Sequence, residues 1–415
     1  FTFKRSLARI NAEYGEIERK LMIRYSLMEQ KADKPEHFLS RDGEGKILLT
    51  GGTGFFGPFL IKSLLEQQHD EIVVLVRSKD SHAGFQRLKE AFLTIGCSEI
   101  LLNEFMTRVS VVCGSLDRRH LGLNEQDWDF LSKNIHTIYH NGALVNYLLD
   151  YEAMRGSNVE GTNEVIRLAN NQRLKVLNYI STTFIFGWST KDVLYETDCN
   201  EEMALLDFGY SQSKWVSERL VENARKKGLP VRIFRPALIS PSIDGKGYNF
   251  DISIRLLSFM LKYGIGTSAN NQVSFTPADI GANNIVAISL VPESVNHTFH
   301  VTRDVFSSMQ DVTAILGQLA EREFRNYPLK EFVPEVISRC KKDDLLFPLL
   351  NFLVRSVDNI SSMEFKRYDN GNYQKFRKLS PFGKEDDTLE AVVNGIYQFI
   401  TNNHIIESEK SENEK

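Results

Sequence analysis

Short apolar stretches recur along the first 240 residues and are separated by segments in which apolar positions follow a helical period. The intervening segments 160–170 and 210–227 show the helical spacing most clearly. Apolar strands that alternate with helices are typical of a parallel sheet covered on both faces. The pattern predicts an α/β fold with a Rossmann-type doubly wound parallel sheet, whose strands are 46–50, 71–76, 109–113, 135–140, 174–181 and 230–235.

Beyond residue 240 the alternation ends, and loops and apolar helices follow. We predict a nucleotide-binding domain over residues 43–240 and a smaller, mostly helical C-terminal lobe, formed by 241–297 and 303–415, that binds the substrate. A strand candidate at 298–302 is predicted to rejoin the main sheet. Residues 1–42 are predicted to form a helical segment or linker.

Composition excludes several classes of protein. With 50 basic and 54 acidic residues, the net charge of −4 gives no electrostatic reason to expect a nucleic-acid partner. The four cysteines are too far apart for a zinc or redox cluster, so neither a metal site nor a structural disulfide is predicted. The chain begins with Phe1 rather than Met, which suggests a piece of a longer protein.

The longest nearly apolar stretch, residues 345–354, is too short to span a bilayer and contains Pro348 and Asn351. Residues 1–30 carry charges of both signs throughout, so no amino-terminal signal is visible. We therefore expect a soluble, cytoplasmic protein without a membrane span, and we favour a monomer.

The strand at 46–50 leads directly into a glycine-rich turn, which is followed by a helix at 58–67. Glycines in such a turn permit close backbone approach to a pyrophosphate, and the start of the helix offers unpaired N–H groups. Glycine-rich turns without a ligand are common, but the flanking strand and helix favour a dinucleotide site. The predicted cofactor contacts in this turn are Gly51, Thr53, Gly54, Phe55, Phe56 and Gly57.

The end of the second strand indicates which dinucleotide is bound. An NAD site requires a carboxylate about 20 residues past the glycines. This chain instead has Arg77 and Lys79, with Arg87 further on. A cationic pocket beside the adenine ribose suits a 2′-phosphate, so the sequence predicts NADPH; the alternative is that Arg77 and Arg87 are solvated surface charges.

Tyr210 and Lys214 are four residues apart, which places a phenol and an ammonium on one helical face. On spacing alone the pair could equally be a surface tyrosine packed over a lysine. It follows the fifth predicted strand, however, and the carboxyl ends of such strands face the ligand crevice. That strand ends beside Thr182 and Thr183, of which Thr182 is the better candidate to contact the substrate.

These groups together predict a hydride-transfer site. A free tyrosine, with a pKa of about 10, is too weak an acid near neutrality. Lys214 and a positive nicotinamide ring would stabilise a phenolate and lower this pKa. In a reduction, Tyr210 would give its proton to a carbonyl oxygen held by Thr182, while hydride reaches the carbonyl carbon.

Asn141 ends the fourth strand and is followed by Gly142 and Ala143, so these residues are expected near the inner ribose of the cofactor. The alternative is that Asn141 caps the next turn. Tyr147 and Tyr151 are spaced like one face of a helix; they border the pocket or, as is more common, simply pack.

Taken together, these residues resemble the extended short-chain dehydrogenase/reductase family. Within it, they resemble the thioester reductase domains that end nonribosomal peptide and polyketide synthases, and the similar domains of carboxylic acid reductases and fungal aminoadipate reductases. The resemblance is clearest from about 44 to 240. It rests on residues 49–57, on 75–77 with Arg87-Leu88, on 140–146, on 158–162, on 209–218 and on Phe234-Arg235-Pro236.

The resemblance implies a reaction and further cofactor contacts. A carrier domain presents an acyl or peptidyl group as a phosphopantetheine thioester, and NADPH-dependent reduction frees an aldehyde, with further reduction to an alcohol left open. The family has Gly-Asp-Leu near the adenine where this chain has Gly114-Ser115-Leu116. Ser115, Leu116 and Pro236 thus join the predicted cofactor contacts, together with Tyr210 and Lys214.

Alternatives remain at this stage. A free-standing fatty acyl-CoA reductase would differ mainly in how the thioester is presented, and a nucleotide-sugar epimerase or dehydratase would share the fold but prefer an acidic ribose contact over Arg77. A hydrolase is disfavoured because no Gly-x-Ser-x-Gly elbow is present. The amino-terminal segment either joins a carrier domain or is a plain packing helix. Residues 345–354 form either a buried core helix, which we favour, or the wall of an acyl tunnel.

Overall fold

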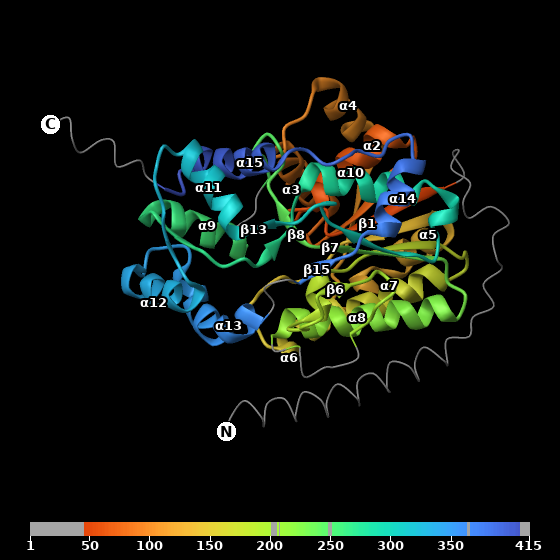
Figure 1. Cartoon of the computed structure of the whole chain (residues 1–415). Helices are drawn as coiled ribbons and strands as arrows, with labels where there is room; N and C mark the ends of the chain where they lie inside the picture. Colours follow the sequence, from red (N-terminus) through yellow and green to blue (C-terminus); the bar gives the residue numbers. More distant parts are fainter. Residues whose placement is uncertain (1–44, 201–205, 207, 248–250, 363–365, 407–415) are drawn as a thin grey trace.

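The computed structural model describes residues 45–200, 206, 208–247, 251–362 and 366–406 (Figure 1). The predicted amino-terminal segment 1–42 and the tail 407–415 lie outside the described residues. None of the helices described is both long enough and apolar enough to cross a membrane. The four cysteines are free.

The centre of the molecule is a seven-stranded sheet in which every neighbouring pair is parallel. This confirms the predicted α/β class. The strand order reverses between β1 and β4, which is where ligands bind in doubly wound sheets. In spatial order the strands are β12 (Thr298–Val301), β7 (Val231–Pro236), β5 (Val176–Ile180), β4 (Ile135–His140), β1 (Lys46–Thr50), β2 (Ile72–Val76) and β3 (Val109–Cys113).

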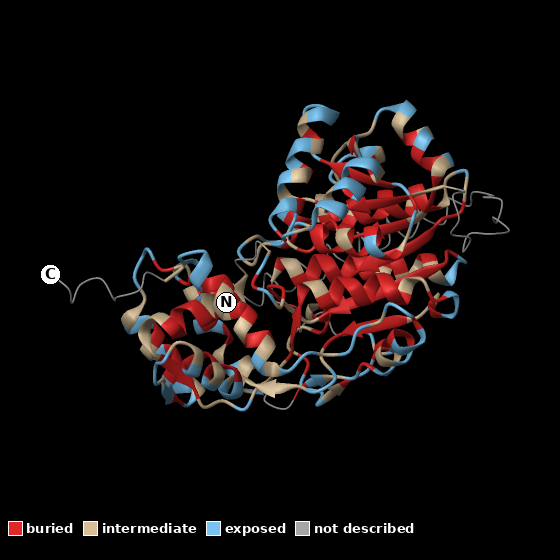
Figure 2. Cartoon of the chain, turned by 90° about the horizontal axis from the view of Figure 1, so that it is seen from above, coloured by how far each residue is buried: buried red, intermediate tan, exposed pale blue. Residues whose placement is uncertain are grey.

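Successive side chains of the strands feed opposite faces of the sheet, as the two-residue period of a strand requires. Leu48 belongs to one hydrophobic core, whereas Ile47 and Leu49 belong to the other. Both faces are apolar, so the strands are largely buried, except for the edge strand β3 (Figure 2). This explains why the sequence shows continuous apolar runs instead of alternation.

Helices cover both faces of the sheet (Figure 1). The core on one face includes residues of α5 (Glu125–Asn134), α6 (Tyr151–Arg155), α7 (Gly161–Asn170) and α8 (Gly209–Lys226). The core on the other face includes residues of α2 (Gly57–Gln67), α3 (Ser81–Leu93), α4 (Glu99–Arg108), α10 (Ala278–Ser289) and α14 (Gly371–Leu379).

A third core forms a helical lobe beside the sheet, on the left of Figure 1. Its helices are α9 (Ile252–Tyr263), α11 (Met309–Leu319), α12 (Leu329–Arg339), α13 (Leu350–Ser362) and α15 (Leu389–Asn402). Four small two-stranded sheets accompany the described part of the fold: β6 (Val193–Leu194) with β15 (Arg367–Tyr368), β8 (Leu238–Ser240) with β11 (Phe275–Pro277), β9 (Ile265–Thr267) with β14 (Arg325–Tyr327), and β10 (Gln272–Val273) with β13 (Ser307–Ser308).

The chain passes between the lobe and the sheet more often than the sequence predicts. Strand β12 pairs with β7, at the position expected for 298–302. Helices α10 and α14, however, fall within the segments assigned to the lobe and pack on the sheet instead. Their apolar faces meet residues far away in the sequence, and Asn284 of α10 donates to the hydroxyl of Tyr373 in α14 at 2.8 Å. Periodicity shows that such helices exist but not which core they join.

Candidate active site

The glycine turn follows β1 and has the shape of a phosphate cradle. Gly51 has φ +74°, and a Cβ there would lie 2.7 Å from the backbone nitrogen of Gly142. At Gly54 the nearest atom to such a Cβ is 3.6 Å away, so the backbone is open toward the cavity. Gly57 differs, because a Cβ there would overlap the carbonyl oxygen of Gly51. Gly57 therefore closes the turn against the helix and, unlike the other predicted turn residues, does not line the cavity.

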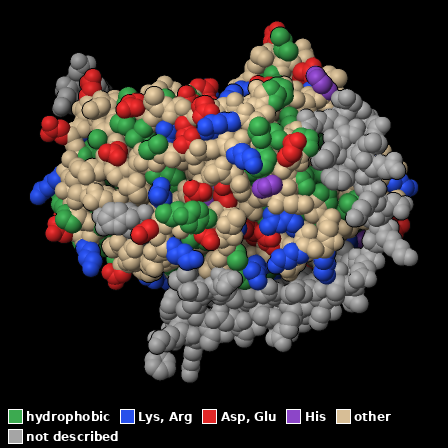
Figure 3. Space-filling model, turned by 45° about the vertical axis from the view of Figure 1, so that its right-hand side comes forward, with side chains coloured by type: hydrophobic (Ala, Val, Ile, Leu, Met, Phe, Trp, Pro, Cys, Tyr) green, Lys and Arg blue, Asp and Glu red, His purple; other side chains and the backbone are tan. Residues whose placement is uncertain are grey.

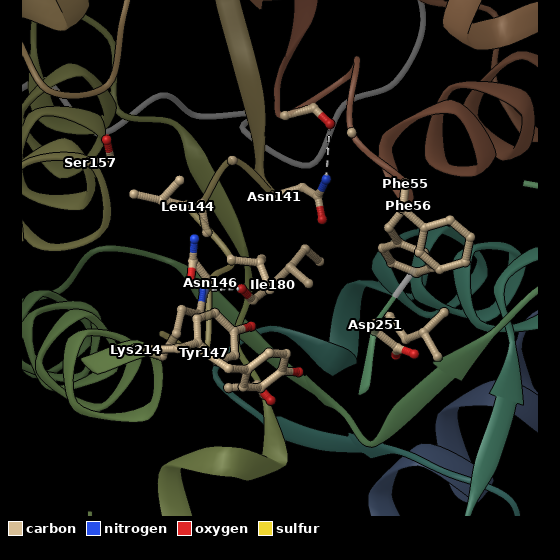
Figure 4. Close-up of a pocket in the computed structure, with 18 of the residues that line it drawn as sticks. Phe55, Phe56, Asn141, Leu144, Asn146, Tyr147, Ser157, Ile180, Lys214 and Asp251 are labelled. Carbon is tan, nitrogen blue, oxygen red and sulfur yellow. Dashed lines mark hydrogen bonds between the residues drawn. The ribbon is translucent and has the colours of Figure 1, made fainter. Parts of the chain in front are cut away.

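A buried network joins the ends of β1 and β4. The Thr50 hydroxyl lies 2.7 Å from Nδ1 of His140 and accepts from the Gly142 backbone N–H at 2.8 Å. Asn141 donates from Nδ2 to the carbonyl oxygen of Gly51 at 3.2 Å (Figure 4). Burial lowers the pKa of His140 to about 3, so the ring is neutral. Asn141 thus braces the glycine turn, a contact that the sequence does not predict, while it also lines the cavity.

The far end of the cavity is cationic. Arg77 and Arg87 both line it, and Arg87 donates from Nη1 to the backbone carbonyl oxygen of Arg77 at 2.9 Å. Ser115, which stands at the family's aspartate position, donates its hydroxyl hydrogen to Asp117. The carboxylate of Asp117, two residues later in the chain, therefore lies beside the position where the family has its aspartate.

Tyr210 and Lys214 lie in the first turns of α8, and Thr182 caps the short helix η3 (Thr183–Phe186) that follows β5. Lys214 donates from Nζ to the carbonyl oxygen of Ile180 at 2.8 Å. The Thr182 hydroxyl accepts from the Phe184 N–H at 3.1 Å. All three predicted groups, the phenol, the ammonium and the hydroxyl, face one cavity.

The electrostatics differ from the sequence expectation at one point. Burial raises the pKa of Tyr210 to about 12, and a hydrogen bond with Thr182 partly opposes the shift. Burial also lowers the pKa of Lys214 to about 7. The expected lowering of the phenol's pKa by Lys214 is therefore not present in the protein alone, because desolvation acts on both groups.

A buried carboxylate that the sequence reasoning passed over supports this pair. Glu218 is one helical turn beyond Lys214 and raises its pKa. Oε1 of Glu218 accepts from Arg235 Nε at 2.9 Å and from Nη2 at 2.5 Å, and Oε2 accepts from Ser181, the neighbour of Thr182. The i, i+4 spacing from Lys214 was the available signal for this role.

These residues surround a cavity of about 720 Å³ between the sheet and the lobe. In Figure 4, Phe55 and Phe56 lie on one side, and Tyr147 and Lys214 on another. Tyr147 lies in a loop and lines the cavity, whereas Tyr151 begins α6 and is packed in the core. The predicted site residues that line the cavity are Gly51, Thr53, Gly54, Phe55, Phe56, Arg77, Arg87, Ser115, Leu116, Asn141, Gly142, Ala143, Thr182, Tyr210, Lys214 and Pro236.

The residues that build this cavity also carry a family signature. The model of an NAD-binding family described as male sterility protein matches residues 49–285, which hold the glycine turn and the Tyr210–Lys214 pair. The chain belongs to this family. Membership indicates a nicotinamide cofactor, and the open backbone at Gly54 and the cationic wall fit a dinucleotide.

Several curated relatives are large synthetases. A linear gramicidin synthase polypeptide of Brevibacillus parabrevis is 33% identical over 273 residues, which are 65% of this chain and 5% of that protein. The nonribosomal peptide synthetase asaC of Aspergillus flavus is 33% identical over 75% of this chain and 31% of its own length. L-2-aminoadipate reductase of Saccharomyces cerevisiae is 28% identical over 85% and 26%. The chain thus spans a third or less of these proteins.

Solved structures of reductase domains also resemble this chain. The terminal R domain from the myxalamid PKS-NRPS biosynthetic pathway has a TM-score of 0.81 and 31% identity, and the match covers 88% of this chain and 93% of that one. The resemblance to thioester reductase domains is therefore confirmed. UDP-glucuronic acid 4-epimerase from Bacillus cereus, with a TM-score of 0.60 and 15% identity over 86% and 96% of the two chains, shares the fold alone.

Proposed function

We propose that this chain reduces an acyl or peptidyl thioester, presented on the phosphopantetheine arm of a carrier protein, to an aldehyde with NADPH. The observation that carries the proposal is that Thr182, Tyr210 and Lys214 share one cavity with the open glycine turn. A proton donor and a dinucleotide cradle in one cavity are the requirements of carbonyl reduction.

The preference for NADPH over NADH rests on the cationic wall. Arg77 and Arg87 line the cavity, and the bond from Arg87 to the Arg77 backbone orders this end of it. Guanidinium groups bind phosphate in a fixed, bidentate geometry, so this wall suits a 2′-phosphate.

The residues of the chain divide the chemistry among them. When bound, NADPH would supply the hydride that reduces the thioester carbonyl carbon. Tyr210 transfers its phenolic proton to the carbonyl oxygen, which Thr182 holds by a hydrogen bond. Lys214, whose pKa Glu218 raises against the lowering effect of burial, stabilises the phenolate that remains while it carries its own proton. The high pKa of Tyr210 in the free protein means that it starts the reaction protonated.

The second half of the reaction requires no further reductant. The product of reduction is a thiohemiacetal, whose carbon–sulfur bond breaks as its hydroxyl loses a proton. The leaving thiolate takes up a proton and becomes the carrier thiol, while the carbonyl re-forms as an aldehyde. One hydride and one proton are thus consumed for each thioester.

The mouth of the cavity suits a flexible arm. Exposed apolar side chains surround it, including Leu144, Val145 and Leu148, which are 38%, 56% and 62% exposed. These three residues lie in the loop between β4 and α6. Asn158 holds this loop, because its side chain accepts from the Leu144 N–H at 2.7 Å and donates to the Leu144 carbonyl at 3.0 Å. The similarity to synthetases and to a thiolation-reductase di-domain supports a carrier as the partner.

The proposal is tested by giving purified protein NADPH together with acyl-carrier, acyl-pantetheine and acyl-CoA thioesters. Loss of reduced-nicotinamide absorbance, with aldehyde or alcohol found by mass spectrometry, is the expected result. Saturation at low acyl-CoA concentration with no gain from the carrier would replace the carrier proposal with a free-standing acyl-CoA reductase. No consumption with any thioester, and turnover of a nucleotide sugar, would overturn the reaction itself.

A further inference from the structure

A second cavity of about 280 Å³ lies between the loop after β5 and the helical lobe. None of the predicted cofactor contacts lines it, and it is separate from the glycine turn. We call it the acyl chamber. Its apolar wall is formed by Phe184, Trp188, Phe208, Leu256, Met260, Val273, Met309, Leu329, Phe332, Val333, Phe352, Leu353, Val357 and Ile360.

Aromatic rings form the boundary between this chamber and the cavity that holds the reacting groups. Tyr147 lies 5.9 Å from Tyr210, 5.8 Å from Phe208 and 6.5 Å from Phe352, measured between ring centroids. Phe184 lies 6.3 Å from Tyr210 and lines both cavities. The chamber therefore begins one ring away from the phenol that is proposed to act on the thioester carbonyl.

Apolar side chains form most of the chamber wall, and its two amide side chains, Asn271 and Gln272, donate to the carbonyl oxygens of Ile360 and Asn270. Among the described residues that line it, the single charged one, Lys366, already donates from Nζ to the carbonyl oxygen of Gly187 at 2.9 Å. Burial lowers the pKa of Lys366 to about 8, which reflects how poorly this region solvates a charge. Apolar cavities of this kind stay dry and take apolar ligands, because burial of apolar surface is favourable.

We propose that the chamber holds the acyl chain of the substrate, and that the preferred thioester is apolar beyond its carbonyl. This rests on the proposed thioester reduction and adds the class of acyl group. With a volume of about 280 Å³, the chamber has room for an alkyl chain of several carbons. Medium-length alkyl or aryl-alkyl thioesters should therefore react best, and chains with a terminal charge poorly.

Helix α13 offers a matched pair of substitutions. Val357 is half-buried and lines the chamber, whereas Val354, three residues earlier, is 42% exposed and lines neither cavity. Val357→Phe fills part of the chamber, and Val354→Phe adds the same group outside it. The measurement is kcat/KM for acyl-pantetheine thioesters from acetyl to dodecanoyl, with a carboxyl-terminated chain as the charged probe.

We expect wild-type kcat/KM to rise with chain length from acetyl to decanoyl. Val357→Phe should lower it at least tenfold for decanoyl but less than twofold for acetyl, while Val354→Phe follows the wild type. Equal losses at every length, or no loss, would overturn the chamber assignment, as would preference for the carboxyl-terminated chain. Reduction of no thioester by the wild type would instead refute the proposed function.

A binding measurement independent of turnover uses Trp188, which lines the chamber. Decanol should change the tryptophan fluorescence of the wild type and of Val354→Phe, with weaker binding to Val357→Phe. The response should disappear in Trp188→Phe. An unchanged signal in Trp188→Phe would show that the alcohol binds elsewhere and would contradict the assignment.

Discussion

The two sides of the cleft are built in different ways. On the sheet side, the glycine turn, Asn141 and Arg77 follow the ends of neighbouring strands, and Arg87 comes from α3. Side-chain hydrogen bonds to backbone carbonyl oxygens join them. On the lobe side, the acyl chamber collects side chains from η3, α9, α11, α12 and α13, which join through apolar contact.

The difference shows where reaction and selectivity are encoded. Positions on the sheet side follow from strand order and turn geometry, so many substrates can be served by the same chemistry. The chamber is shaped by side-chain volume, and a change of one residue alters what fits. Figure 3 shows both basic and acidic side chains on the described surface of one face.

The largest expected effect breaks the sheet side at its proton donor. Tyr210→Phe keeps the ring contacts with Tyr147 and Phe184 but removes the hydroxyl. We expect kcat for thioester reduction to fall by about 10²- to 10⁴-fold, the usual worth of a general acid. The affinity for NADPH, measured by fluorescence titration, should change less than about twofold.

Tyr195→Phe is the control for this change, because Tyr195 is 51% exposed and lines neither cavity. It should behave as the wild type. A Tyr210→Phe variant that retains more than a tenth of wild-type kcat would remove Tyr210 from the mechanism.

The next effect tests whether the sheet side depends on its buried support. Glu218→Gln leaves the buried Arg235 without a full counter-charge, which costs about 3–5 kcal/mol when one partner of a buried pair is removed. Glu222→Gln in the same helix breaks the more exposed pair with Arg225, worth about 0–1 kcal/mol. Urea unfolding measures both, and equal losses would show that the Glu218 pair is not special.

Arg77→Ala tests whether the cationic wall binds the 2′-phosphate of NADPH. Loss of a hydrogen bond to a charged group costs about 1.5–3 kcal/mol, so NADPH should bind on the order of 10- to 100-fold more weakly. NADH lacks the 2′-phosphate, and its affinity should stay within about threefold. Isothermal titration with the two cofactors measures this, and equal weakening of both would refute the 2′-phosphate assignment.

The smallest effect is a shift in pH dependence. Lys214 acts as the ammonium, and its pKa is about 7 in the free protein, so kcat/KM should fall as pH rises through about 7. Because Glu218 raises this pKa, Glu218→Gln should move the alkaline decline to lower pH. A decline that stays in place, or moves upward, would show that Glu218 does not support the charge of Lys214.

Much of the sheet side could be predicted from the sequence. Residues 109–113 and 135–140 are strands with the predicted bounds, and β12 joins the sheet. Such elements carry their own signal, since a buried parallel strand is a short continuous apolar run. Gly57 is an exception: the sequence predicts a cofactor contact, but this residue packs against Gly51 instead. That contact exists only in the folded turn, so the sequence pattern does not reveal it.

The lobe side could not be predicted in the same way. The stretch 345–354 supplies Leu346, Leu349 and Leu353 to the core of the lobe, as the favoured interpretation predicts. Its additional contacts with the two cavities, through Pro348 and Leu349 and through Phe352 and Leu353, could not be assigned from the sequence. Phe184, Trp188 and Lys366 gave no signal in sequence, because they meet only when distant segments fold together. Contacts between residues that are far apart in the sequence leave no periodic pattern from which the chamber could be predicted.

The central claim is that the glycine turn and Tyr210 serve one reduction in one cavity. The most direct measurement supplies NADPH carrying deuterium in its transferable position, with decanoyl-pantetheine, and determines the mass of the product. The account predicts decanal, or the alcohol derived from it, with one deuterium at the former carbonyl carbon for each hydride consumed. Formation of decanoic acid without oxidation of NADPH would contradict it.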